Sequence, residues 1–447
     1  MSSFSIENFG CRATEADASA LRRELLASGL TLADDHAQAE VIVLNTCTVT
    51  AAADSQAREA VRKIHRTNPN ARIVVTGCYA QRAPEELAAL DGVALIVGNS
   101  HQAQIPALIR EWNAPAAEGQ ADFVPLARLN DDAMSLARGP AKILTGDIFA
   151  QTGVNIPLSS AADAAAHDRT RPILKVQDGC NNRCSYCVIP FVRGRSRSLL
   201  PQAVVDEVRS LTSAGAREIV LSGINLGSYG RDLAPRAAVG DVVRRILDET
   251  TIERLRFSSI EPQDVTEDFV ALVASSPRLA PHFHVPLQSG CDRILHAMHR
   301  WYRAAHYAER VRMIRRIIPD AAIGADVIVG FPGETAAEFE ETAQFIDALP
   351  FTYLHVFSFS ERPGTAAQHL ADRVPQHVIR ERARALRALG EQKAAAFRAA
   401  QSQQTHRALT LARTGNNWTE ALTANYLKVR IPGRHPANEW REVHMES

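Results

Sequence analysis

Short apolar runs alternate with amphipathic segments along the first hundred residues. Four runs rich in β-branched residues predict strands, at residues 3–10, 40–46, 71–77 and 92–99. Between them, apolar positions recur at the spacing of one helix face in residues 15–29, 54–67 and 83–90. Continuous apolar strands separated by helices are typical of parallel sheets, so a parallel α/β sheet is predicted here.

A second alternation begins near residue 171 and repeats six times. The predicted strands cover residues 172–176, 217–223, 254–260, 282–287, 322–330 and 352–359. Repeated strand–helix units of this length predict a partial (β/α)6 barrel, with its chemistry at the carboxyl ends of the strands. A long helix over residues 376–402 ends the series, and short strands after it predict a small β module.

The segment between the two alternations is rich in Ala, Asp, Gly and Ser and has no regular pattern. It is predicted to be a connector, with a short hairpin near residues 141–150. The predicted organisation is an α/β sheet domain at 1–115, a connector at 116–168, a barrel with its terminal helix at 169–400 and a β module at 401–447.

Composition indicates a soluble globular protein of more than one domain. The chain has 447 residues, of which 46% are hydrophobic and 22% are charged. It contains neither an apolar run of about 18 residues nor a secretory signal, so a cytoplasmic protein without membrane association is expected. In that reducing compartment, clustered cysteines indicate metal ligands or redox groups rather than disulfides. The net charge is zero, so binding to nucleic acid would need local basic patches.

Three of the seven cysteines, Cys180, Cys184 and Cys187, lie within eight residues, in the loop after the first predicted barrel strand. A structural zinc site prefers four protein ligands, and only three are local. Three thiolates on a tight loop instead suit a [4Fe–4S] cluster with one open iron. A zinc knuckle or buried free thiols are the alternatives.

The other candidate ligands are Cys11, Cys47 and Cys78, each placed at the end of one of the first three predicted strands. The carboxyl ends of parallel strands lie on one edge of a sheet, where α/β proteins bind ligands. These three cysteines are therefore expected to come together in space.

The spacing of the 180–187 cysteines is that of the radical S-adenosylmethionine (SAM) enzymes. The segments NFGCRATEADASAL, LNTCTVTAAADSQAR and VTGCYAQRAPEEL resemble the three N-terminal cysteine motifs of the methylthiotransferase family within that superfamily. The resemblance continues through KVQDGCNNRCSYCVIPFVRGRSRS to DVIVGFPGET and covers residues 5 to about 395. It implies a cluster-binding N-terminal domain, a radical SAM barrel and a TRAM-like C-terminal module that binds RNA.

The resemblance also implies the cofactors. Two [4Fe–4S] clusters would be held by two cysteine trios, namely Cys11, Cys47 and Cys78, and Cys180, Cys184 and Cys187. The open iron of the second cluster would bind SAM and yield a 5′-deoxyadenosyl radical, while another SAM methylates sulfur carried at the first. An electron donor such as flavodoxin or ferredoxin is implied as a partner.

Further residues at strand ends are candidate contacts to SAM or to the target base. The resemblance places Tyr186 beside the adenine of SAM and the backbone of Val329 and Gly330 along it. The other candidates at strand ends are Ser222, Gly223, Ser259, Glu261 and Gln288. Each polar candidate could instead make a loop hydrogen bond, and Tyr186 could pack the loop onto the barrel.

Four residues carry weaker signals. Cys291 departs from the family pattern and is interpreted as a spectator thiol. His282 and His284 alternate on one predicted strand and could line the barrel interior, where Asp326 could be a satisfied polar group.

A tRNA substrate would need basic residues to contact its phosphates. The expected RNA contacts are Arg193, Arg195, Arg197, Lys428 and Arg430. Residues 293–316 form a second basic stretch, in which Trp301 and Tyr302 are expected to be available for stacking on bases. A solvated helix face is the alternative for that stretch.

The substrate prediction follows the family branches. NTCTVT, GCYAQ and SSIEP look most like the branch that acts on threonylcarbamoyladenosine. The predicted enzyme therefore adds a 2-methylthio group to N6-threonylcarbamoyladenosine at position 37, in the anticodon loop of tRNA. The alternatives are isopentenyladenosine at position 37 of tRNA, an aspartate of a ribosomal protein, and a non-enzymatic, zinc-stabilised RNA-binding protein.

Overall fold

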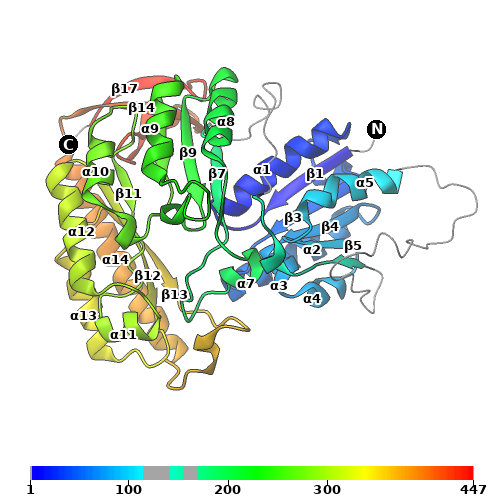
Figure 1. Cartoon of the computed structure of the whole chain (residues 1–447), viewed down its shortest axis with the longest axis horizontal. Helices are drawn as coiled ribbons and strands as arrows, with labels where there is room; N and C mark the ends of the chain where they lie inside the picture. The colour runs from blue at the N-terminus through cyan, green and yellow to red at the C-terminus, as the bar shows by residue number, and fades with distance from the viewer. Residues whose placement is uncertain (1–2, 114–140, 155–169, 446–447) are drawn as a thin grey trace, which may run out of the picture. The chain divides into compact units, whose positions relative to one another are not determined.

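The computed structural model describes residues 3–113, 141–154 and 170–445. The chain divides into two compact units (Figure 1). The first holds the N-terminal sheet together with residues 178–182 and 187–197, and the second holds residues 170–177, residues 183–186 and the chain from Ser198 on. The domain limits expected from the sequence stay a prediction.

The first unit is a six-stranded sheet in the order β2-β1-β3-β4-β5-β6, with every neighbouring pair parallel. Its strands are β1 (Ser3–Asn8), β2 (Thr31–Leu32), β3 (Val41–Thr46), β4 (Arg72–Gly77), β5 (Val93–Gly98) and β6 (Lys142–Leu144). Its main helices are α1 (Arg12–Ala27), α2 (Ala51–Thr67), α3 (Cys78–Arg82), α4 (Pro84–Ala88) and α5 (Ile105–Asn113). Apolar side chains of β3 and β4 pack against α2 and α3 on one face and against α1 and α5 on the other. This two-sided burial explains their continuous apolar runs.

The prediction of a short hairpin near residues 141–150 is wrong. Residues 142–144 instead pair in parallel with Leu95, Ile96 and Val97 of β5, and a 3₁₀ turn follows at Ile148–Ala150. The free edge of β5 presents unpaired backbone groups, which this short strand satisfies.

The second unit contains the predicted partial barrel. Its parallel strands are β7 (Ile173–Asp178), β9 (Glu218–Gly223), β10 (Arg254–Phe257), β11 (His282–His284), β12 (Ala322–Val329) and β13 (Tyr353–Ser358), and β8 (Arg197–Ser198) pairs beside β7. Single bridges between Leu255 and Leu279 and between Ser259 and His284 link β10 to β11. The six strands therefore follow one another in chain order, and the predicted strands are all confirmed.

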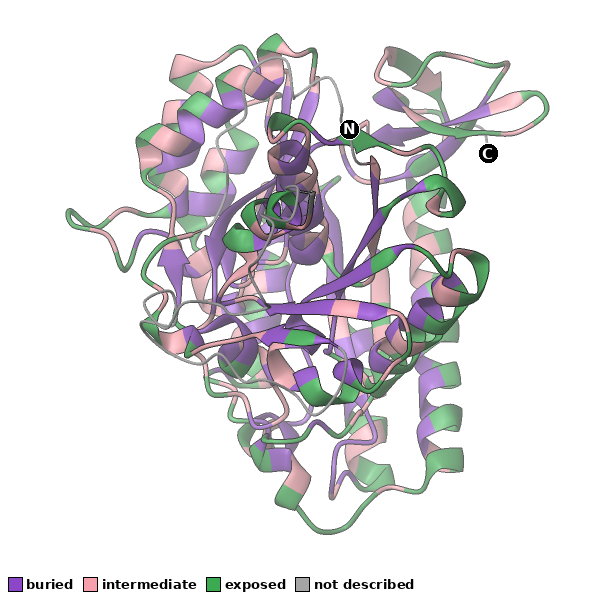
Figure 2. Ribbon diagram, turned by 90° about the vertical axis from the view of Figure 1, so that its right-hand side faces the viewer, coloured by how far each residue is buried: buried purple, intermediate pink, exposed green. Residues whose placement is uncertain are grey.

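Helices cover the outer face of the barrel (Figure 1). They are α8 (Pro201–Ser213), α9 (Val239–Glu249), α10 (Glu267–Ala274), α11 (Asp292–Ala297), α12 (Ala304–Ile317), α13 (Ala336–Asp347) and α14 (Gln376–Ala400). Figure 2 shows the strands largely buried and the helices with exposed residues on one side. On β12, Ile323, Ala325 and Val327 join the apolar core beneath these helices. Because side chains alternate along a strand, Gly324 and Asp326 face the barrel lumen.

The C-terminal module is a four-stranded antiparallel sheet in the order β16-β15-β14-β17. Its strands are β14 (Thr405–Thr414), β15 (Trp418–Thr423), β16 (Lys428–Pro432) and β17 (Trp440–His444). A small core that includes Ala408, Ala421 and Val429 holds it together. Among the described helices, none has the length and apolarity needed to cross a bilayer.

Candidate functional site

The first cysteine trio lies at the carboxyl edge of the N-terminal sheet, as predicted. Cys47 directly follows β3, and Cys78 directly follows β4 and begins α3. Cys11 lies three residues after β1 and is the N-cap of α1. A Cβ on Gly10, whose φ is 129°, would lie 2.5 Å from the Cβ of Cys47. Glycine at position 10 therefore lets the first loop lie against the second cysteine.

The surroundings of Cys47 and Cys78 oppose thiolate formation. Cys47 and Cys78 are buried, while Cys11 is exposed. Burial, with a smaller contribution from the neighbouring thiols, raises the pKa of Cys47 to about 12. Burial also raises the pKa of Cys78. A bound metal centre supplies the positive charge that would hold such buried cysteines as thiolates.

A buried arginine adds positive charge at the same place. Arg193 is 2% exposed, and its guanidinium donates to Asp17 at 2.8 Å and to Asp178 at 3.1 Å. Its charge opposes the effect of burial on the pKa of Cys78. Arg193 ends the short helix α7 (Ile189–Arg193), which directly follows the 180–187 loop.

Helix α7 packs within the first unit, against the cysteine edge of the sheet. Val188 and Val192 form a small apolar cluster with Cys78. The side-chain amide of Asn99 donates to the Val192 carbonyl at 2.8 Å. The chain that leaves the second cysteine trio is thus held by the same unit that carries the first.

The second trio lies on a loop that begins directly after β7. Cys180, Cys184 and Cys187 are each partly buried. A Cβ on Gly179, whose φ is 70°, would lie 2.0 Å from the carbonyl oxygen of Arg195, so only glycine lets the loop turn back so tightly. The Cys180 amide donates to the Gly194 carbonyl at 3.0 Å, which closes this turn.

Arg300 supports the middle cysteine of this loop. Its Nη1 lies 3.3 Å from the Sγ of Cys184, and its other nitrogens donate to Glu261 and to the Tyr302 hydroxyl. The side chain of Arg300 is 3% exposed. This buried guanidinium therefore connects Cys184 to Glu261 and Tyr302 and holds the loop against the barrel.

Both trios fit clusters better than single ions. None of the seven cysteines, all of which are described, forms a disulfide. Among the described residues, only His284, Asp326 and His355 bring three ligand atoms within 4.8 Å of one another. The thiolates of a [4Fe–4S] cluster bind different irons, so they lie farther apart than the ligands of one ion. Three cysteines per site then leave one iron open for another ligand.

Comparisons with known proteins agree with this chemistry. Residues 3–98 match the Uncharacterized protein family UPF0004, and residues 174–346 match the Radical SAM superfamily. The Threonylcarbamoyladenosine tRNA methylthiotransferase MtaB of Aquifex aeolicus is 34% identical over 96% of both chains. The MtaB of Bacillus subtilis is 33% identical over 97% of this chain and 91% of the relative. The chain belongs to the radical SAM methylthiotransferase family.

A second group of relatives in this family carries another substrate name. The tRNA-2-methylthio-N(6)-dimethylallyladenosine synthase of Syntrophobacter fumaroxidans is 36% identical over 83% of this chain and 77% of the relative. Among solved structures, the radical SAM methyltransferase TsrM of Kitasatospora setae has a TM-score of 0.55 at 18% identity, over 82% of this chain and 77% of that chain. That likeness supports the fold. SAM and [4Fe–4S] clusters are the cofactors of this methylthiotransferase.

The predicted SAM contacts lie at the carboxyl ends of the barrel strands. Ser222 and Gly223 end β9, Val329 ends β12, and Gln288 forms a bridge with Val327. The φ of Gly330 is 77°, and a Cβ there would lie 2.4 Å from the side chain of Ile379. These positions permit the predicted role, which stays a prediction.

Three other candidates have protein partners. Ser259 is partly buried and forms the bridge with His284. Glu261 pairs with Arg300, and burial raises its pKa although that guanidinium opposes the shift. Tyr186 packs against an apolar cluster that contains Cys291. The spectator interpretation of that buried thiol also stays a prediction.

The expected RNA contacts differ in accessibility. Arg197 and Arg193 are buried near Asp178, so their surroundings do not support phosphate binding, whereas Arg195 is exposed. Tyr302 is buried and its hydroxyl donates to backbone carbonyls, so it is not available to stack on a base as expected. Trp301 is 73% exposed.

In the C-terminal sheet, Lys428 and Arg430 are both exposed. The guanidinium of Arg430 lies 4.6 Å above the ring of Trp418. Both side chains can therefore reach a phosphate, and their contact with RNA stays a prediction.

Sequence reasoning missed an arginine-lined groove on α14. Arg380, Arg384 and Arg387 line a cavity of about 420 Å³, together with Ser358 at the end of β13. Their spacing of four and three residues puts them on one helix face, a signal that the sequence already contained.

Proposed function

We propose that this chain is the tRNA methylthiotransferase that converts N6-threonylcarbamoyladenosine at position 37 to its 2-methylthio derivative. The observation that carries the proposal is the pair of cysteine trios, each following parallel strands at their carboxyl ends. The identity to MtaB relatives over nearly the whole chain supports this substrate over the dimethylallyl alternative. Flavodoxin or ferredoxin would supply electrons, and the enzyme would work in the cytoplasm, where tRNA is modified.

Each cysteine trio would bind one cluster. Cys11, Cys47 and Cys78 would hold the first cluster, and the 180–187 trio after β7 would hold the second. With SAM, the clusters supply the radical chemistry that replacing an unreactive C–H bond requires, because acid–base side chains cannot do so. The protein orients the reactants and excludes water. Arg300 fixes the loop around Cys184, and the strand-end residues of the barrel would hold SAM.

Nucleoside analysis tests the substrate. The chain is expressed in a bacterium that lacks its own MtaB but makes threonylcarbamoyladenosine, and digested tRNA is analysed by mass spectrometry. We expect 2-methylthio-threonylcarbamoyladenosine to appear, and a Cys184→Ala chain to give none. Methylthiolation of dimethylallyladenosine alone would move the enzyme to the other branch, and no methylthiolated nucleoside at all would contradict the proposal.

The groove on α14 is a candidate surface for tRNA phosphates. Replacing Arg380 and Arg384 with alanine should weaken tRNA binding. The negative slope of log affinity against log salt should become less steep by about 2, since about one counterion is released per phosphate contact. Fluorescence anisotropy of labelled tRNA between low and moderate salt measures this slope. Arg244→Ala, at an exposed position on α9, is the matched control. An unchanged slope in the double variant would exclude this surface.

A further inference from the structure

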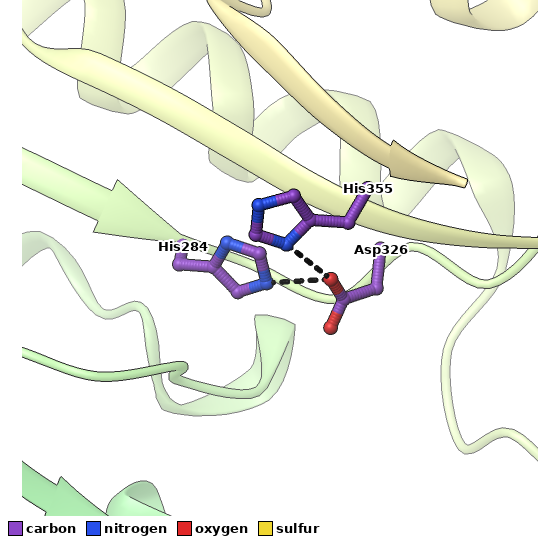
Figure 3. A group of neighbouring side chains, drawn as sticks. All are labelled: His284, Asp326 and His355. Carbon is purple, nitrogen blue, oxygen red and sulfur yellow. Dashed lines mark hydrogen bonds and ion pairs between the residues drawn. The ribbon is translucent and has the colours of Figure 1, made fainter. Parts of the chain in front are cut away.

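Three side chains with metal-binding groups converge in the barrel lumen. His284 ends β11, Asp326 lies within β12 and His355 lies within β13 (Figure 3). His284 Nε2 lies 2.9 Å and His355 Nδ1 lies 3.2 Å from the same oxygen, Oδ1 of Asp326. All three ligand atoms lie within 4.8 Å of one another.

The strand register explains this convergence. Asp326 is paired with His355 across β12 and β13, and His284 is paired with Gly324 across β11 and β12. Because side chains alternate along each strand, all three point to the lumen face rather than to the helices. Three rigid, neighbouring strands therefore carry the group, which suits a site that must keep a fixed geometry.

A tyrosine orients His284 from behind. The hydroxyl of Tyr353 lies 2.9 Å from His284 Nδ1 and 2.8 Å from His282 Nε2. A Cβ on Gly324 would lie 1.9 Å from Cζ of Tyr353, so only glycine leaves room for this ring. Histidines that bind metals are usually fixed in this way by a partner on their second ring nitrogen.

We propose that His284 Nε2, a carboxylate oxygen of Asp326 and His355 Nδ1 bind a first-row divalent cation such as Zn²⁺. A tetrahedral Zn²⁺ ion with bonds of 2.0–2.1 Å separates its ligands by about 3.3 Å, close to both of the observed nitrogen–oxygen distances. Two histidines and one carboxylate leave coordination positions open for a further ligand. The side chains of His355 and Asp326 are 50% and 25% exposed, so an ion can reach the group.

The chemistry of the three side chains also suits a cation. One carboxylate and two imidazoles are ligand types that first-row divalent cations take in proteins. A hydrogen-bonded network without an ion is the competing explanation, and it predicts no specific metal binding.

Metal analysis of the intact enzyme separates these explanations. Full-length protein with both clusters reconstituted without oxygen is incubated with Zn²⁺ and freed of unbound metal, and zinc per chain is measured by mass spectrometry. We expect about one zinc per chain in the wild type, and binding about tenfold or more weaker in His355→Ala and Asp326→Asn. His377→Ala, which removes an exposed histidine of α14, should bind zinc like the wild type.

The variants remain informative if one of them is unstable. His355 is half exposed, so its replacement should leave the fold intact, and circular dichroism with iron content checks both fold and clusters. Wild type that binds no zinc, or equal zinc in wild type and His355→Ala, would overturn the proposed site. Neither result depends on tRNA, so the test is independent of the proposed function.

Discussion

Replacing Cys184 with alanine should lower the rate of reductive SAM cleavage by at least about 10³-fold. This corresponds to an increase of about 4 kcal/mol or more in the activation free energy. Cys180 and Cys187 alone leave two irons of the second cluster without a protein ligand, so that cluster should be lost. Iron content should fall from about eight to about four per chain. Anaerobic iron and sulfide analysis, with quantification of 5′-deoxyadenosine after reduction, measures both effects.

Two further cysteine variants make this result specific. Cys291→Ala removes a buried thiol that packs against Ile294 and Phe331, so it should keep its iron and cleave SAM normally. Cys47→Ala should lose the first cluster but still cleave SAM, and it should transfer no methylthio group. A Cys184→Ala protein that keeps about eight irons, or that still cleaves SAM, would show that the 180–187 trio is not the radical site.

Local rules were sufficient to predict the two parallel sheets and the placement of the first cysteine trio. Strand β3 is buried along its whole length, and most of β12 is buried too. Their apolar runs can therefore be recognised in the sequence without knowing which elements pack against them. Cys47 and Cys78 follow their strands directly, and parallel strands share one carboxyl edge. The convergence of this trio therefore needed no knowledge of which helices cover the sheet.

The surroundings of individual side chains could not be predicted in the same way. Arg193 looks like a surface residue in a basic segment, but its partner Asp17 is 176 residues away in the chain. In the sequence Tyr302 looks available for stacking on a base, but its hydroxyl donates to the carbonyl of Pro286. Strand β6 has only three residues, too few to show a period. Burial and partners at these positions depend on long-range packing, which local patterns do not contain.

The same dependence on distant partners shapes the ion network at the amino-terminal end of the barrel strands. Glu218, on β9, is fully buried and accepts from Arg256 at 2.8 Å, with Arg254 at 3.4 Å. These arginines also donate to backbone carbonyls of the C-terminal sheet, including Arg407 at 2.8 Å and Thr423 at 3.1 Å. Glu218 therefore neutralises the charges that attach this sheet to the barrel.

Glu218→Gln should lower the free energy of unfolding by about 3–5 kcal/mol, because it leaves buried guanidinium groups without a counter-charge. Glu253→Gln is the control, since Glu253 lies just before β10 and pairs with Arg407 of the C-terminal sheet in solvent. That exposed pair should contribute no more than about 1 kcal/mol. Chemical denaturation followed by circular dichroism compares the two variants, and equal losses would show that burial does not set the strength of this network.

The pH dependence of stability gives a second measure of the same carboxylate. Burial would raise the pKa of Glu218, but Arg256 and Arg171 outweigh it and lower the pKa from 4.5 to about 2. A carboxyl whose pKa is lower in the folded state stabilises the fold above its unfolded pKa and loses that contribution as the pH falls. The wild type should therefore lose about 3 kcal/mol between pH 4.5 and pH 2 from this group. Glu218→Gln cannot titrate, so its loss over this pH range should be smaller by that amount, and an identical acid profile would contradict the assigned role.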